Sequence, residues 1–208
     1  MNNLKNKIKK LLHILSVMYI ERRKGLNFTT LDIYFTGIKP ILSLQKSEGE
    51  WVDSIFEHLT IKSTDSLIDI GCSKGFVLSK VYHLGFARLT GIDSNNRVIK
   101  IACKNMKRLK INKVTFEHID ARDFEHYTYY NYFYLFNPFP LKIFSVVIDK
   151  IVETLISNPR KITIIYVNPH YSDYIVKSGK DKEVYLVLKH KIYNNYTGKY
   201  DHIYENEE

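Results

Sequence analysis

Short apolar runs alternate with segments of helical spacing along most of this chain, and that alternation limits the possible folds more than any other feature. Strands that are separated by helical segments must pair in parallel through crossover connections. Continuous apolar runs also suit strands that are covered on both faces. We therefore predict an α/β fold with a doubly wound, mostly parallel sheet. The expected parallel strands are Ser66–Ile70, Leu89–Asp93, Val114–Ile119, Tyr132–Phe136 and Ile162–Val167.

Helices are expected next to these strands, and a hairpin is expected near the end of the chain. The segments Glu183–Lys189 and Lys199–Tyr204 alternate in polarity and flank the turn residues Asn194, Asn195 and Gly198. This pattern predicts an antiparallel hairpin and a total of seven strands. Apolar residues recur at the spacing of one helix face over 51–59, 76–84, 98–109 and 141–155.

Residues 1–50 are expected to form an appendage to a main domain over residues 51–208. The first 24 residues hold six of the nine net positive charges, and apolar residues recur there at helical spacing. This pattern predicts a basic amphipathic helix that caps the fold or a second subunit, or that contacts a polyanion or a membrane surface. An irregular cover segment is expected over 25–50, and Ser47 with Glu50 is a capping box that predicts a helix start.

Several classes of protein are disfavoured by the length of the apolar runs and by the cysteine count. The longest nearly apolar stretch, Leu11–Ile20, is about half of the roughly 20 residues that a membrane-spanning helix needs. The chain has two cysteines, Cys72 and Cys103, too few for a disulfide framework or a four-ligand zinc site. No His, Asp or Glu cluster has metal-ligand spacing either. We expect a cytoplasmic protein with no membrane span and no metal.

The turn after the first predicted strand has the composition of a ligand site. In a doubly wound sheet, ligands bind beyond the carboxyl ends of the strands, where the strand order reverses. The first strand leads into Gly71, Cys72, Ser73 and Gly75, and these small residues allow a ligand to approach the backbone closely. The spacing from Gly71 to Gly75 lacks the Gly-x-Gly-x-x-Gly pattern of dinucleotide sites, which disfavours NAD or FAD.

Acidic residues follow the next two strands. The second strand ends at Asp93, which lies 24 residues after Asp69 and is followed by Ser94. An acid at this place can accept hydrogen bonds from the ribose hydroxyls of an adenosine-containing cofactor. The third strand is followed by Asp120 and Ala121. Three acids at neighbouring strand ends favour a ligand site over a solvated turn.

These residues resemble the class I S-adenosylmethionine-dependent methyltransferases, which have a Rossmann-like fold, from about Trp51 to Pro169. Asp69–Gly75 is similar to the first motif of that family, acid-x-Gly-x-Gly-x-Gly, with Ser73 at the middle glycine. The resemblance implies S-adenosylmethionine as the cofactor, with Asp93 on its ribose and Asp120 on its adenine amino group. The implied cofactor contacts are Asp69, Gly71, Cys72, Ser73, Gly75, Asp93, Ser94, Asp120, Ala121 and Asn137.

The segment Phe136–Pro140 resembles the family's fourth motif, where the methyl group and the acceptor meet. Asn137 is therefore a candidate for both cofactor binding and catalysis. His170, after the fifth predicted strand, is our candidate general base for a hydroxyl acceptor. The same segment is partly similar to the motif of amino-group methyltransferases, but Phe139 and Pro140 depart from that motif.

The distribution of charge bears on the acceptor. Only three net positive charges belong to the residues after position 24, whereas nucleic-acid enzymes usually need a broad basic face. We therefore expect a small-molecule, sugar or glycan-precursor acceptor. An RNA or protein methyltransferase and a cofactor-binding protein without turnover are the alternatives. The sequence does not indicate an oligomeric state.

Overall fold

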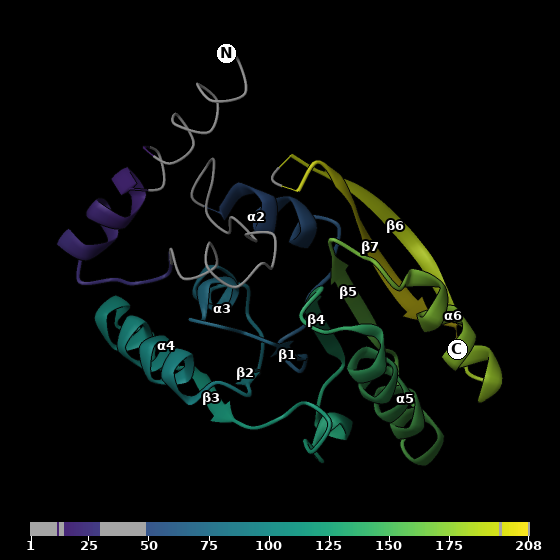
Figure 1. Ribbon diagram of the computed structural model, residues 1–208. Coiled ribbons are helices and arrows are strands. Elements are labelled where there is room, and N and C mark those ends of the chain that lie inside the picture. Colours follow the sequence, from purple (N-terminus) through teal and green to yellow (C-terminus); the bar gives the residue numbers. More distant parts are fainter. Residues whose placement is uncertain (1–11, 13–14, 30–48, 196, 208) are drawn as a thin grey trace.

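One sheet organises the part of the chain that the computed structural model describes, which is residues 12, 15–29, 49–195 and 197–207 (Figure 1). Its strands are β1 Ser66–Ile70, β2 Arg88–Asp93, β3 Val114–His118, β4 Tyr132–Phe136, β5 Thr163–Val167, β6 Leu186–Asn194 and β7 Lys199–Asn206. The helices after residue 49 are α2 Glu50–Phe56, α3 Phe76–Val81, α4 Asn96–Leu109, the 3-10 helix η3 Tyr127–Tyr129, α5 Leu141–Ser157 and α6 Ser172–Asp181.

The strand order of the seven-stranded sheet is β3-β2-β1-β4-β5-β7-β6. Strands β1 to β5 pair in parallel, and β7 pairs antiparallel with both β5 and β6. The predicted Rossmann-like sheet and its C-terminal hairpin are therefore confirmed. The strand order reverses between β1 and β4, which is the place where this type of sheet binds ligands.

Apolar side chains cover both faces of the sheet. Helices α5 and α6 pack with η3 over one face, where Ile68, Phe133 and Tyr166 lie. Helices α2, α3 and α4 pack over the other face, against residues such as Leu67 and Tyr134. Successive residues of a strand point to opposite faces, so strands covered on both sides need continuous apolar runs.

Two elements near the C-terminus differ from the sequence prediction. Helix α6 was not predicted, because it buries only Ile175 and the small residues Ser178 and Gly179, which leave no apolar stripe. Strand β6 runs to Asn194 and not to Lys189, and its register shifts between Leu188 and His190. That irregularity interrupts the alternation on which the prediction depended.

The N-terminal region is described in part. Residues 15–23 are helical, in agreement with the second half of the predicted helix, whereas residues 1–11 and the centre of the cover segment lie outside the described residues. Helix α2 begins at Glu50 with Gly49 as its N-cap, and the predicted cap Ser47 lies outside the described part. Among the helices that the structure describes, none has the length and apolarity to cross a bilayer.

Candidate active site

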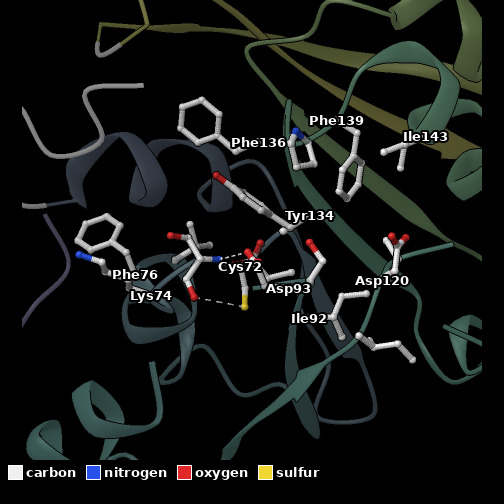
Figure 2. A pocket seen from close by; sticks show the side chains of 18 of the residues that line it. Cys72, Lys74, Phe76, Ile92, Asp93, Asp120, Tyr134, Phe136, Phe139 and Ile143 are labelled. Carbon is white, nitrogen blue, oxygen red and sulfur yellow. Dashed lines mark hydrogen bonds between the residues drawn. The ribbon is translucent and has the colours of Figure 1, made fainter. Parts of the chain in front are cut away.

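A cavity of about 440 Å³ lies at the carboxyl ends of β1, β2 and β4, where the strand order reverses. Its volume falls in the range of small-molecule binding sites. Figure 2 shows Cys72 and Asp93 near its centre, Asp120, Phe139 and Ile143 on one side, and Phe76 and Phe136 on the other. The cavity therefore has an acidic centre between two apolar ends.

The turn from β1 to α3 forms the floor of this cavity. The backbone N–H groups of Gly71 and Cys72 both donate to the carbonyl of Ile92, at 2.9 and 3.0 Å, which holds the turn against β2. Gly71 has a φ of +83°, and a Cβ there would lie 2.6 Å from Cβ of Pro138. Gly75 is the N-cap of α3 with a φ of +78°, and a Cβ there would meet Phe116 at 2.7 Å. Both positions therefore require glycine.

Asp93 connects β2 to this turn. One of its carboxylate oxygens accepts from the N–H of Ser73 at 3.0 Å, and the other accepts from the N–H of Asn95 at 2.9 Å. These bonds fix the orientation of the carboxylate at the cavity wall. A carboxylate has about four acceptor positions, so Asp93 retains capacity for donors on a ligand.

Asp69 is a buried carboxyl group in the cavity wall, with 3% of its surface exposed. Burial, together with the negative charge of Asp93, raises the pKa of Asp69 to about 8. No hydrogen-bond donor from the described residues reaches its carboxylate. A cationic group in the cavity would favour the ionised form of Asp69. These two carboxyl groups, as hydrogen-bond acceptors, suit a ligand that has positive charges and ribose hydroxyls, as S-adenosylmethionine has.

Asp120 lies at the other side of the cavity, paired with a neighbour. Its two oxygens accept from Nε and Nη2 of Arg122 at 3.0 and 2.7 Å, and one also accepts from the N–H of Arg122 at 2.9 Å. These hydrogen bonds lower the pKa of Asp120. The carboxylate is thus ionised and fixed beside Ala121, Phe139 and Ile143, which supply apolar surface at this end.

Aromatic rings form the opposite end of the cavity. The ring of Trp51 lies 5.5 Å from that of Phe136, edge to face, and 6.4 Å from that of Phe76. Phe28 meets Phe76 edge to face at 5.5 Å. These four residues come from four segments far apart in the sequence. The sequence analysis placed Phe136 in the segment that resembles the fourth motif, but it named none of the four as a site residue. For Trp51 and Phe76 the available signal was their position at the first turns of α2 and α3.

Residues 25–29 are bonded to the body of the protein beside this aromatic end. Nζ of Lys74, a buried side chain, donates to Oδ1 of Asn27 at 2.8 Å and to the carbonyl of Thr29 at 3.1 Å. Asn105 accepts from the N–H of Asn27 at 2.9 Å and donates to its carbonyl at 3.2 Å. These contacts place Phe28 in the cavity wall.

The predicted site residues divide into two groups. Those in the cavity wall are Asp69, Gly71, Cys72, Ser73, Asp93, Ser94, Asp120 and Ala121. Gly75, Asn137 and His170 are described residues that do not line it. The hydroxyl of Tyr166 donates to Oδ1 of Asn137 at 3.1 Å and accepts from the N–H of His170 at 3.3 Å, so one tyrosine connects these two residues.

Two further features of the site concern a cysteine thiol and metal ligands. Burial raises the pKa of the Cys72 thiol, which disfavours a nucleophilic thiolate. Among the residues that the structure describes, no group of three or more His, Cys, Asp or Glu side chains could hold a metal ion.

Comparison with known proteins supports a function for this geometry. The profile of a family described as "Methyltransferase domain" matches residues 61–195. A search of curated proteins finds no match in sequence.

Solved methyltransferase structures have a similar fold. The magnesium protoporphyrin IX methyltransferase of Synechocystis PCC 6803 with bound SAM is 16% identical, with 84% of this chain and 92% of that chain covered and a TM-score of 0.60. N-methyltransferase NodS of Bradyrhizobium japonicum WM9 in complex with S-adenosyl-L-homocysteine is 13% identical, with 91% and 98% covered and a TM-score of 0.60. The ribosomal protein L11 methylase of Lactobacillus delbrueckii subsp. bulgaricus is 12% identical, with 76% and 77% covered and a TM-score of 0.55.

These identities establish the fold alone, whereas the family profile spans more than half of the chain. The protein therefore belongs to the methyltransferase domain family and is a class I S-adenosylmethionine-dependent methyltransferase.

Proposed function

We propose that this enzyme methylates a small-molecule acceptor that binds at the aromatic end of the cavity. The observation that carries the proposal is the group of rings Phe28, Trp51, Phe76 and Phe136. Phe28, Phe76 and Phe136 are only partly buried, so their rings retain surface for a ligand. Aromatic walls of this kind stack planar molecules or the apolar face of a sugar.

We assign the acidic centre and the other apolar end to the cofactor. Asp93 would accept from the ribose hydroxyls, and Asp120 with Ala121 would lie at the adenine. Asp69 and the turn that follows it would surround the cationic methionine part. When bound, S-adenosylmethionine supplies a methyl group on a sulfonium that leaves without a proton. The residues of the chain therefore need mainly to orient the two ligands and to exclude water.

His170 and Asn137 have less direct roles in this proposal. Nε2 of His170 lies 3.2 Å from Nζ of Lys199, and burial together with that charge lowers the pKa of His170. A lowered pKa keeps the imidazole neutral near pH 7, which is the form that a general base needs. We retain His170 as the base for a hydroxyl acceptor, reached through the loop after β5. Asn137 would position this loop through Tyr166.

The cofactor assignment is tested by calorimetric titration with S-adenosylmethionine, S-adenosylhomocysteine and NAD. The first two should bind and NAD should not. Asp93→Ala should weaken binding of both adenosyl ligands about thirtyfold, because the ribose loses a charged acceptor. Asp173→Ala, an exposed acid on α6, is the matched control and should bind like the wild type. Tight NAD binding, or an unchanged affinity in Asp93→Ala, would contradict the assignment.

The acceptor assignment is tested by methyl transfer from labelled cofactor to a small-molecule panel and to tRNA and rRNA. Phe28→Ala should raise the KM of a small-molecule acceptor roughly tenfold, because one stacking ring is lost. The cofactor Kd should stay the same. Tyr185→Ala, whose ring is 64% exposed, is the control. Turnover confined to RNA or to protein would refute a small-molecule acceptor.

A further inference from the structure

A basic surface covers one edge of the molecule, away from the cavity chemistry. Helix α4 has no acidic residue, and the chain from Arg97 to Lys113 holds seven Lys or Arg and no Asp or Glu. Most of these side chains are exposed. We define the basic face as the exposed residues Arg22, Arg23, Lys24, Lys100, Lys104, Lys107, Arg108 and Lys110.

Hydrogen bonds join the two parts of this face. Nε of Arg108 donates to the carbonyl of Lys24 at 3.0 Å, and Asn105 holds Asn27 as described above. Figure 1 shows the helix of residues 15–23 at the same edge of the molecule as α4, opposite the β6–β7 hairpin. In the described part of the chain, no ion pair involves a residue of the basic face. Its charges are therefore available to a partner.

An apolar stripe lies beside these charges. Leu12, Leu15, Tyr19 and Ile20 are between 44% and 63% exposed. Leu12, Leu15 and Tyr19 are spaced by three and four residues, so they share one side of the helix. The guanidinium of Arg23 lies 5.9 Å from the ring centroid of Tyr19, at the border between the stripe and the basic face. An amphipathic helix with this arrangement is typical of segments that lie in the plane of a membrane surface.

We propose that this edge binds an anionic lipid surface, with the apolar stripe inserted between headgroups and the basic face on the phosphates. A nucleic acid would use the charges but would leave aliphatic side chains such as Leu15 without a partner. A second copy of the chain would bring like charges together, which opposes association through this face. An anionic lipid surface offers phosphates to the charged side chains and an apolar phase to the stripe. The proposal does not depend on the acceptor, because it concerns residues outside the cavity.

Vesicle co-sedimentation of the full chain tests this proposal. Binding is expected to vesicles of phosphatidylcholine with about 30% phosphatidylserine and not to phosphatidylcholine alone. Raising the salt from about 0.1 M to about 0.5 M should weaken the binding, because exposed charges are screened. Two double variants separate the contribution of the basic face from that of the apolar stripe. Lys104→Glu with Lys107→Glu, and Leu15→Ser with Tyr19→Ser, should each reduce the affinity about tenfold or more.

Matched variants on the opposite side control for general effects of charge and apolarity. Lys177→Glu with Lys180→Glu on α6, and Ile156→Ser with Tyr185→Ser, change exposed residues of the same kinds and should bind vesicles like the wild type. Thermal unfolding and cofactor affinity of every variant verify that the fold is intact. Absent binding to anionic vesicles, stronger binding to single-stranded RNA than to vesicles, or a dimer that Leu15→Ser with Tyr19→Ser dissociates, would each overturn the proposal.

Discussion

Asp69 near the end of β1 and Asp201 near the start of β7 are both buried carboxyl groups of one sheet, separated by β4 and β5, yet their surroundings differ. Asp201 accepts from the N–H of Asn168 at 3.0 Å and from the side-chain amide of Asn194, and burial raises its pKa only to about 6. Asp69 has no such donors among the described residues, it lies near Asp93, and its pKa is raised to about 8. Asp201 is therefore satisfied within the protein, whereas Asp69 faces a cavity, where a bound ligand would supply the donors that it lacks.

The largest expected effect distinguishes the two acids by the pH dependence of stability. A raised pKa means that the folded protein keeps a proton that the unfolded chain has lost. The stability that Asp69 contributes is therefore complete below about pH 4 and is lost as the pH rises to about 8, by about 1.4 kcal/mol per pH unit. Asp69→Asn should remove this slope in urea unfolding between about pH 5 and pH 8.

Asp201→Asn is the control for that experiment, because the pH range over which Asp201 affects stability ends at a lower pH than the range of Asp69. The pKa of Asp201 in the folded protein is about 6. Its contribution to the slope of unfolding free energy against pH should therefore disappear above about pH 6. If Asp69→Asn unfolds with the same pH dependence as the wild type, Asp69 is already ionised in the unliganded protein and the contrast between the two acids fails.

The next effect concerns the cost of removing each carboxyl group. Asp201→Ala leaves the N–H of Asn168 and the amide of Asn194 without an acceptor, which should lower the free energy of unfolding by about 3 kcal/mol. Asp69→Ala deprives no donor of its partner and should cost less. Urea unfolding of both variants at one pH measures the difference, and a larger cost for Asp69→Ala would reverse our interpretation.

A smaller effect links Asp69 to the charge of the cofactor. S-adenosylmethionine has a fixed sulfonium charge that S-adenosylhomocysteine lacks, and both have the same amino group. The ratio of their affinities should therefore rise with pH below about 8, by up to about tenfold per unit, as Asp69 becomes ionised. Calorimetry at several pH values measures this ratio. It should be constant in Asp69→Asn, and a constant ratio in the wild type would exclude this role.

The smallest predicted effect lies between the two acids, at Tyr166 on β5. Tyr166→Phe removes the hydroxyl that contacts Asn137 and His170 and should cost about 1 kcal/mol of stability. If these residues position the loop after β5 that carries His170, kcat should also fall severalfold while the cofactor Kd stays unchanged. Tyr132→Phe, which loses one bond to the carbonyl of Thr60 outside the cavity, is the control. Equal kcat values in the two variants would remove Tyr166 from the proposed machinery.

Much of the fold could be predicted because it depends on local patterns. Strands β1 and β4 begin and end at the predicted residues, since each is an apolar run next to turn residues. Helix α6 and the far half of β6 depend on tertiary packing and on a register shift, which leave no period in the sequence.

The site shows the same division between local motifs and distant contacts. The turn after β1 and the acids after β2 and β3 are local motifs, and the structure brings them to one cavity. Phe28 reaches that cavity only through bonds from Asn27 to Lys74 and Asn105, which are distant in sequence. The basic face was missed for a related reason. The net charge after position 24 is a sum in which acidic residues of other elements offset the lysines and arginines of α4.

The bonds to residues 25–29 also bear on how the enzyme matures during synthesis. This stretch leaves the ribosome well before Lys74 and Asn105, the two side chains that later hold it. Until both have been translated, these hydrogen bonds cannot form, and the aromatic wall that we propose for the acceptor is incomplete. We therefore expect this wall to form only after synthesis has passed Asn105 and that region has folded back upon residues 25–29.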